Sequence, residues 1–521
     1  MLLAACYLIL VMKLNQLTIQ QAIEKLDAGV ITSVDLTQAC LDRIKEIDDK
    51  VKALLTICED EAIAEAKAAD ARRAKGEKGG LLGIPYIAKD IIMTKGVRTT
   101  AASKILENYI APFDATIIKK LREAGAVLLG KSNLDEFAHG GSTENSAFGP
   151  THNPWDLEKV PGGSSGGSGA AVAADMCIFA LGTDTGGSVR CPAAFCGVVG
   201  LKPTYGRSSR FGLMAMTSST DVPGIIAKTA EDTAIVLQVM AGHDKYDAST
   251  PEEPVPNYEA ELKKSPLERG VRPGRTGCVK PGEKKKKCDK PLVGLKIGMP
   301  VEYYGEGLAS GVRAAIDEVK KKFVELGAEI IEISLPHAKY AVPVYYIITP
   351  SEISSNLARF DGIKYGFSDK EAKNLLEVYT KSRGKGFGRE AKRRIMLGTY
   401  ALSAGYRDAY YLQAQKVRTK IKNEMDAVLN EVDIILTPTQ PTIAYKIGSY
   451  TADPLQMYLE DIFVIPASLA GLPAMSLPCG FDQNLPVGMQ LIGPRFGEGK
   501  IFRFASAFQQ ATDWHQKKPI L

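Results

Sequence analysis

Apolar residues along the first half of the chain recur with periods that predict alternating helices and strands. Amphipathic or alanine-rich runs, several opened by capping residues, predict helices within residues 15–75 and at 116–125, 168–175 and 229–240. Short apolar runs bounded by glycine or charge predict buried strands at 84–88, 126–129 and 176–182. No residue pattern in the first helical layer, residues 15–75, suggests catalysis or ligand binding, and we expect this layer to serve packing alone.

The second half repeats the same alternation. A strand at 294–299, a helix at 308–326 and a strand at 330–333 have the spacing of a βαβ unit. Further helices are predicted at 389–402, 406–429 and 500–511, and further strands at 432–436, 474–477 and 488–492. The chain is therefore predicted to be an α/β protein, with one large domain over residues 13–521.

The positive charge of the chain is concentrated in one segment. The net charge is +5, yet residues 265–290 hold nine lysines and arginines against three acidic residues, so the remainder is close to neutral. The body of the protein therefore lacks the charge excess of a nucleic-acid-binding protein. We interpret 265–290 as a basic loop inserted into the domain, with contact to RNA phosphates as the alternative.

Three other features are interpreted without a functional role. Residues 1–12 are almost wholly apolar but too short to span a bilayer, and we expect them to be an extension from an early start site, with no membrane association. The nine cysteines show no zinc-binding spacing and suggest a reducing compartment. Residues 125–132 match the P-loop pattern, but the four residues between its glycines form a predicted strand, so no ATP site is expected.

The candidate chemistry begins at residues 161–200, which contain two Gly-Gly-Ser units ending at Ser164 and Ser188. A flexible linker is disfavoured, because the first unit leads directly into a predicted helix and strand. A nucleophile elbow is also disfavoured, because the Pro-bounded segment before Ser164 is no strand. The remaining interpretation is a pair of serines activated by a group other than histidine.

Lys89 ends the apolar run 84–88 and is followed by Asp90. One interpretation is a surface lysine paired with Asp90. The other is a lysine that burial keeps neutral, so that it can act as a base. The local sequence leaves both open.

Together, the order and spacing of Lys89, Ser164 and Ser188 resemble the amidase signature family, whose members hydrolyse amides with a Ser–cisSer–Lys triad. The resemblance covers the chain from about residue 13 to its end, apart from the basic loop. It implies the amidase-signature fold, a mixed central β-sheet covered on both faces by helices. It also implies that Ser188 is the nucleophile, Ser164 the proton relay and Lys89 the base.

The resemblance extends to the groups around the reacting atoms. The backbone of Thr185, Gly186 and Gly187 is expected to form the oxyanion hole. Tyr345, Arg394 and Asp461 fall in segments that resemble those holding glutamine in this family. Arg394 suits the α-carboxylate as a bidentate partner, Asp461 the α-ammonium, and Tyr345 a hydrogen bond or packing contact, although Arg393 leaves the arginine register open by one residue.

Four further blocks resemble those family members that act as the glutaminase of a tRNA-dependent amidotransferase. They are residues 102–110, 133–156, 197–213 and 390–411. This resemblance implies that ammonia from glutamine is used to convert Glu-tRNA(Gln) to Gln-tRNA(Gln), or Asp-tRNA(Asn) to Asn-tRNA(Asn). It implies B and C subunits as partners in a heterotrimer, misacylated tRNA reached through the complex, no cofactor in this chain, and ATP and magnesium used by the partner subunit. The expected location is the cytoplasm, or an organelle stroma or matrix.

Two positions depart from the usual pattern of the family. Ile91 stands where Asn is common, and Cys191 stands where Gln is common. Both are expected near the site without belonging to the triad. A free-standing amidase acting on small amides, and a non-catalytic scaffold of the same fold, remain as alternative functions.

Overall fold

The computed structural model describes residues 13–263, 290–305, 307–450 and 454–521. Residues 1–12 and nearly all of the basic loop at 265–290 therefore lie outside the described residues, and our interpretations of both remain predictions. Among the described helices, none is long and apolar enough to cross a membrane.

A single mixed sheet of eleven strands organises the described chain, in the order β1-β3-β2-β4-β6-β5-β10-β11-β9-β7-β8. The strands are β1 (Leu54–Ile57), β2 (Pro85–Lys89), β3 (Val127–Ser132), β4 (Phe179–Asp184), β5 (Val199–Lys202), β6 (Val222–Ala227), β7 (Lys296–Pro300), β8 (Glu329–Ile333), β9 (Ile434–Pro438), β10 (Ala474–Asp482) and β11 (Leu485–Ile492). Strands β3, β2 and β4 run parallel, as do β9, β7 and β8, and antiparallel pairs join these two groups. The predicted α/β class and mixed sheet are confirmed.

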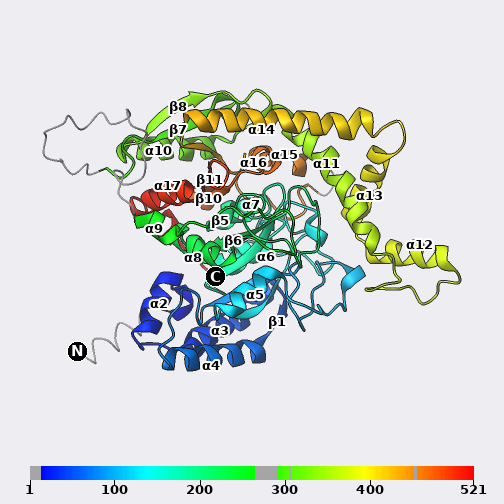
Figure 1. Cartoon of the computed structure of the whole chain (residues 1–521), viewed down its shortest axis with the longest axis horizontal. Helices are drawn as coiled ribbons and strands as arrows, with labels where there is room; N and C mark the ends of the chain where they lie inside the picture. Colours follow the sequence, from blue (N-terminus) through cyan, green and yellow to red (C-terminus); the bar gives the residue numbers. More distant parts are fainter. Residues whose placement is uncertain (1–12, 264–289, 306, 451–453) are drawn as a thin grey trace, which may run out of the picture.

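Helices line the sheet on both sides (Figure 1). They are α2 (Ile19–Asp27), α3 (Ser33–Val51), α4 (Glu59–Ala74), α5 (Thr116–Glu123), α6 (Gly166–Ala173), α7 (Arg190–Cys196), α8 (Ala230–Met240), α9 (Tyr258–Lys263), α10 (Ser310–Glu325), α11 (Ala341–Asn356), α12 (Leu375–Gly386), α13 (Arg389–Leu402), α14 (Gln413–Glu431), α15 (Pro454–Leu459), α16 (Ile465–Ala470) and α17 (Glu498–Gln510). In Figure 1 the sheet runs from β8 at the top to β1 at the bottom, with α8, α10 and α17 on one side and α6, α7 and α16 on the other.

The structure corrects several elements predicted from local sequence. The supposed all-helical layer at 15–75 contains β1, which forms the sheet edge by pairing antiparallel with β3. The strand predicted at 176–182 begins and ends later, as β4, because it pairs with β2 and β6 in that register. Helix α7 falls where the sequence predicts a loop, since its short Cys-Pro-Ala sequence shows no helical period. Tertiary pairing overrode local propensity at each of these places.

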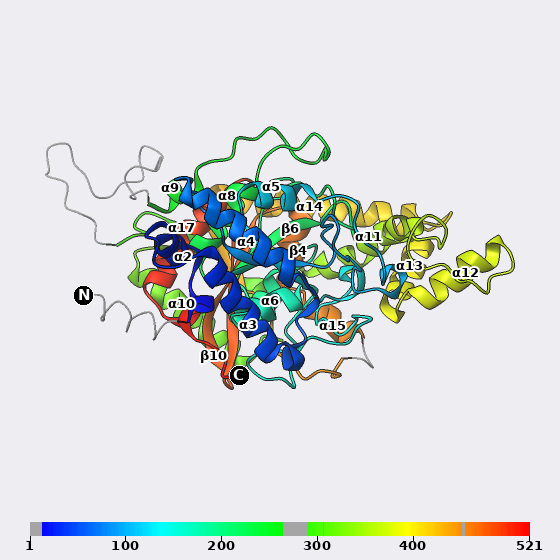
Figure 2. The same ribbon diagram turned by 90° about the horizontal axis from the view of Figure 1, so that it is seen from below.

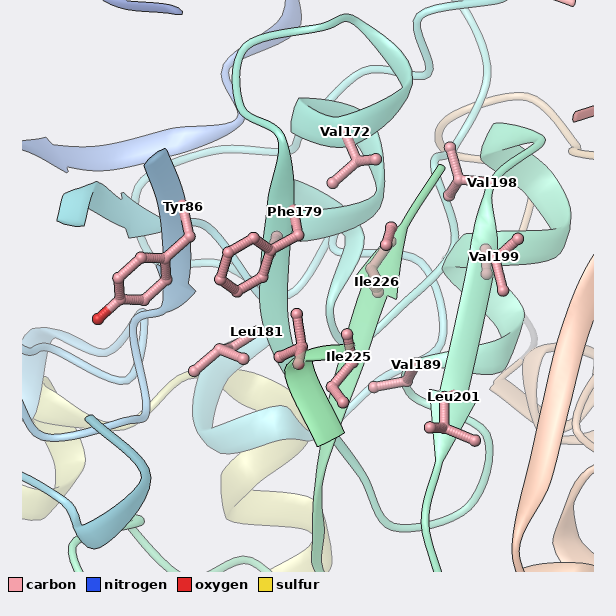
Figure 3. Close-up of a cluster of buried hydrophobic side chains, with 14 of the residues drawn as sticks. Tyr86, Val172, Phe179, Leu181, Val189, Val198, Val199, Leu201, Ile225 and Ile226 are labelled. Atoms are coloured by element: carbon pink, nitrogen blue, oxygen red, sulfur yellow. The ribbon is translucent and has the colours of Figure 1, made fainter. Parts of the chain in front are cut away.

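The central strands are buried on both faces, which makes them a rigid support for the loops at their ends. Phe179 of β4 stacks on Tyr86 of β2 with ring centroids 5.2 Å apart. Figure 3 shows these rings beside Leu181 and Ile226, within a continuous apolar cluster. The carboxyl ends of β2 and β4, where Lys89 and Asp184 lie, are thereby fixed relative to each other.

Candidate active site

Lys89 is fully buried at the end of β2. Its Nζ lies 2.7 Å from Ser164 Oγ, 2.9 Å from Ser165 Oγ and 2.9 Å from Thr183 Oγ1. Burial lowers the pKa of this amine to about 7, because the charged form loses its hydration, although three more distant aspartates oppose the shift. Lys89 therefore lies among hydroxyl groups and has a low pKa, as a general base requires.

The alternative in which Lys89 pairs with Asp90 at the surface is wrong. Asp90 is also fully buried, but its carboxylate accepts hydrogen bonds from Thr100 and lies 3.6 Å from Lys131 Nζ. The two side chains have different partners, because Asp90 lies just after the last residue of β2, where its backbone N–H donates to the Ser132 carbonyl of β3 at 3.0 Å. Asp90 thus forms an ion pair with Lys131, and no carboxylate among the described residues contacts Lys89.

Ser164 lies just before α6, in a loop whose backbone requires glycine. The Gly163–Ser164 peptide is cis, and a Cβ at position 163 would lie 2.2 Å from Asp135 Oδ2. Gly162 adopts φ +84°, a left-handed conformation that favours glycine. The Ser164 carbonyl accepts the amide N–H of Asp135 at 3.3 Å, which ties this loop to the neighbouring segment. The Gly-Gly-Ser sequence is therefore a geometric requirement of the site.

Ser188 lies in the loop between β4 and α7, beside the Ser164 loop. The amide N–H of Ser165 donates to the Ser188 carbonyl at 3.0 Å, and the Ser188 residue is 7% exposed. The two serines expected from the sequence therefore come together. This backbone hydrogen bond joins the loop before α6 to the loop that follows β4.

Asp184 and Arg190 hold this loop, and sequence reasoning missed both. The Asp184 carboxylate accepts the amide N–H of Gly187 at 2.9 Å and of Val189 at 3.2 Å. The Arg190 guanidinium pairs with the same carboxylate at 2.8 and 3.0 Å, and both side chains are fully buried. Burial alone would raise the pKa of Asp184, but Arg190 lowers it to about 2. The Asp-x-Gly-Gly-Ser-x-Arg spacing was the signal available in the sequence.

The contacts of Asp184 reduce the number of backbone amides that could form the expected oxyanion hole. The N–H of Gly187 is donated to Asp184, whereas no acceptor is recorded among the described residues for the amides of Thr185 and Gly186. Gly186 lies directly against Tyr345, because a Cβ there would come within 2.6 Å of the Tyr345 ring and hydroxyl. Thr185 and Gly186 are therefore the amides best placed to receive a developing oxyanion.

The three expected substrate residues gather near the same loop. Tyr345 of α11 contacts Gly186, and its ring packs edge-on against Tyr346 at 5.1 Å. Arg394 of α13 is buried, with its guanidinium carbon 5.4 Å from the centroid of the Tyr346 ring. The Tyr346 hydroxyl donates to Asp461 Oδ2 at 3.3 Å. Tyr346, which the sequence did not single out, thus links the site's arginine to its aspartate.

The geometry also distinguishes Arg394 from its neighbour. Arg394 Nε donates to Glu390 Oε1 at 2.8 Å, while Arg393 is partly exposed and bonds the other oxygen of Glu390. Tyr458 of α15 donates its hydroxyl to Glu390 at 2.8 Å. Glu390 and Tyr458 were not predicted, although the spacing of four between Glu390 and Arg394 is the helical pairing distance.

Asp461 and Cys191 lie together beside the loop of Ser188. Burial raises the pKa of Asp461 to about 7, so its carboxylate lacks a full counter-charge in this structure. Cys191 Sγ is 3.8 Å from Asp461 Oδ1, and a Cβ at Gly187 would approach that sulfur to 2.8 Å. Cys191 is therefore packed between the loop of Ser188 and Asp461. Ile91 is buried and lines a small cavity together with Thr183 and Thr185, so both residues lie near the site as expected.

Comparison with known proteins agrees with the motifs and the fold. A family model described as Amidase matches residues 35–502. The chain belongs to the amidase signature family.

Relatives of this amidase are similar over nearly its whole length. It is 51% identical to the A subunit of glutamyl-tRNA(Gln) amidotransferase from Carboxydothermus hydrogenoformans, over 98% of this chain and 100% of that protein. It is 50% identical to the protein of the same name from Coxiella burnetii, again over 98% and 100%.

Solved structures show the same similarity. The crystal structure of the A subunit of glutamyl-tRNA(Gln) amidotransferase from Thermotoga maritima superposes with a TM-score of 0.74 at 44% identity, covering 96% of this chain and 95% of the other. The peptide amidase PAM, solved with the inhibitor chymostatin, gives a TM-score of 0.80 at 29% identity, with 97% and 99% covered.

Replacing Arg190 by methionine should destabilise this amidase strongly, because it leaves the Asp184 carboxylate buried without its partner. We expect the free energy of unfolding, from urea denaturation, to fall by about 3–5 kcal/mol. Lys321→Met is the matched control, since Lys321 pairs with Glu318 on an exposed helix face and its loss should leave the free energy of unfolding almost unchanged. Equal losses in the two variants would contradict the role assigned to Arg190.

Proposed function

We propose that this amidase is the glutaminase subunit of a tRNA-dependent amidotransferase. It hydrolyses the side-chain amide of glutamine and supplies the ammonia to a partner. The observation that carries the chemistry is the buried Lys89 amine, bonded at 2.7 Å to Ser164 and adjoining the loop of Ser188. The relatives named above, about 50% identical over the full chain, support the choice of substrate and reaction.

The contacts of Lys89 support a direction of proton flow. A neutral amine has two N–H donors and one lone pair, so it can accept a hydrogen bond from one of its three hydroxyl partners. The Ser165 hydroxyl lies 3.2 Å from the Thr183 carbonyl and donates there. Of the other two hydroxyls, Ser164 lies nearer to Nζ, at 2.7 Å against 2.9 Å for Thr183, and we assign it as the proton donor to Lys89 in the reaction. Ser164 is thereby left with a lone pair that can receive the proton of Ser188.

In the proposed reaction Ser188 Oγ attacks the amide carbon while its proton passes to Ser164 and the Ser164 proton passes to Lys89. The oxyanion accepts hydrogen bonds from the Thr185 and Gly186 amides. Collapse of the intermediate breaks the carbon–nitrogen bond, and the leaving group takes a proton back through Ser164 to depart as ammonia. Water then hydrolyses the ester on Ser188 by the same relay and releases glutamate.

Substrate selection follows from two buried charges of opposite sign. Arg394 has its Nε on Glu390, and no acceptor is recorded among the described residues for its two terminal nitrogens, which suit the α-carboxylate. Asp461 suits the α-ammonium, because an added positive charge would lower the pKa that burial has raised. Tyr345 contacts Gly186 and packs against Tyr346, so we place the aliphatic part of glutamine beside its ring.

The proposal includes partners and a location. The B subunit receives the ammonia and activates misacylated tRNA, either Glu-tRNA(Gln) or Asp-tRNA(Asn), with ATP and magnesium. The C subunit completes a heterotrimer in the cytoplasm, or in an organelle if the source is eukaryotic. This chain itself requires no cofactor, because a serine ester carries the whole of its reaction.

The test is ammonia release from glutamine by the purified chain, alone and together with B and C subunits, misacylated tRNA and ATP. We expect weak release alone, strong release in the complex, and at least a roughly thousandfold loss in Ser188→Ala because the nucleophile is gone. Ser354→Ala is the matched control, since that hydroxyl only bonds its own helix.

Equal turnover with and without partners, or faster turnover of unrelated amides, would favour a free-standing amidase, the alternative that similarity to the peptide amidase supports. No release in any mixture would favour the non-catalytic scaffold. Either result would overturn the proposed function.

The rate of hydrolysis should rise with pH and level off above the pKa of Lys89. Only the neutral amine accepts a proton, and burial lowers its pKa to about 7, so kcat at pH 6 should be about one tenth of its plateau. Asp461 titrates in the same range and direction in the free enzyme. Measuring kcat at saturating glutamine separates the two, because the bound ammonium keeps Asp461 ionised. A flat kcat between pH 6 and 9 would exclude Lys89 as the base.

Arg394→Lys should raise KM for glutamine by at least about tenfold while changing kcat little. A lysine loses the planar fork that binds a carboxylate through two hydrogen bonds, a cost of about 1–3 kcal/mol. Arg393→Lys is the control one residue away, which also bonds Glu390 but is partly exposed, and should leave KM unchanged. The reverse outcome would assign the α-carboxylate to Arg393.

A further inference from the structure

Exposed apolar side chains are concentrated in one part of the described chain. Of the 23 large hydrophobic residues that are exposed among the described residues, twelve lie between 363 and 412. Soluble monomers rarely expose a contiguous apolar patch of this kind unless it binds something. Figure 2 shows that α12 and α13, which belong to this segment, form one end of the molecule's long axis, away from α10 and α17.

Helix α13 has an apolar outer face as well as a buried one. Its buried residues are Glu390, Ala391, Arg394, Gly398 and Ala401. Met396, Leu397 and Tyr400 lie between these positions and are exposed, by 67%, 48% and 51% of their surfaces. A helix that only covered a core would carry polar residues there.

Three tyrosines extend the outer face into a connected aromatic cluster. The ring centroids of Tyr400 and Tyr406 lie 4.4 Å apart, and Tyr410 packs 5.9 Å from Tyr406 and 6.4 Å from Tyr400. Each remains two-fifths or more exposed although its ring contacts the others. Tyrosines that are already held in place lose little entropy on binding and are frequent at the centres of protein interfaces. We name the set Met396, Leu397, Tyr400, Tyr406 and Tyr410 the Tyr400 surface.

The Tyr400 surface and the proposed substrate site share helix α13. Arg394 lies on the inner face of the same helix, two residues before Met396. Glu390, one turn earlier, binds Arg394 and also Tyr458 of α15. On that short helix Leu455 and Leu459 are exposed as well. A molecule bound on the outside of α13 would therefore contact the helix that holds glutamine.

Charge and composition indicate the chemistry of the occupant. Residues 373–412 contain nine lysines and arginines against three acidic residues. The exposed centre is apolar and aromatic, which fits a protein core contact, whereas phosphate recognition needs basic groups at the centre. The complementary surface is an apolar patch with an acidic rim.

We propose that the Tyr400 surface is where the protein subunit that consumes the ammonia docks on this chain. The proposal rests on the proposed function, because a free-standing amidase would have no such partner. Docking there places the acceptor against the helix of Arg394, so association and glutamine binding are linked.

The test compares two double variants of the full chain, Met396→Glu/Tyr400→Glu and Met396→Lys/Tyr400→Lys, in binding to the co-expressed B and C subunits. Both should raise the Kd at least tenfold, measured by biolayer interferometry, because a charge of either sign disrupts an apolar contact. Both should also lose the stimulation of glutaminase activity by the partners while keeping the basal activity and the unfolding midpoint. Val30→Glu/Val324→Glu is the matched control, since these residues are 49% and 52% exposed and follow or belong to α2 and α10, which lie toward the other end of the molecule from α13 (Figure 2).

The outcomes separate the docking surface from the function. If the wild-type chain binds the B and C subunits and both variants bind equally well, the docking surface is overturned while the glutaminase function stands. If the Lys variant binds tRNA more tightly, the Glu variant binds it less, and neither changes binding to the subunits, the surface is an RNA contact. If the wild-type chain binds neither subunit, the proposed function fails and the docking surface fails with it.

Discussion

The burial of the Lys89 ammonium is the constraint on which the site depends. A charged amine loses several kilocalories per mole of hydration when it is buried, and a contacting carboxylate would restore the charged form. Here the three contacts of Nζ are hydroxyl groups, and the adjacent acid, Asp90, pairs with Lys131. The protein thus lowers the pKa of this amine by burying it without a contacting counter-ion.

Asp184 shows the opposite case, a buried ionisable group that has a counter-charge. This carboxylate is equally buried, yet it receives a full counter-charge from Arg190 and two backbone N–H groups, so it remains ionised. It therefore serves as a fixed anchor for the loop of Ser188, while Lys89 serves as a group that changes charge. Two buried ionisable residues on neighbouring strands acquire different tasks because one is paired and the other is not.

The sequence predicted what is encoded locally. Strand β2, the glycine loops and the two serines lie within short motifs, and the family resemblance supplied the positions of Tyr345, Arg394 and Asp461. It did not predict Glu390, Tyr346 or Tyr458, because the contacts of Tyr458 with Glu390 and of Tyr346 with Asp461 join residues 68 and 115 positions apart, and no local period records them. For the same reason the sequence left the partner of Asp90 open, since Lys131 lies on another strand, β3.

Helix α13 connects the interior of the site with the outside of the molecule. Its inner face carries Arg394 in a network with Glu390 and Tyr458, and its outer face carries Tyr400. Because a helix moves as a unit, a partner that shifts α13 must also shift Arg394. Linkage then requires the effect to be mutual: a partner that tightens glutamine binding tenfold is itself bound tenfold more tightly once glutamine is present, which corresponds to about 1.4 kcal/mol. Such reciprocity would weaken glutamine binding by the isolated chain and favour it in an assembled complex.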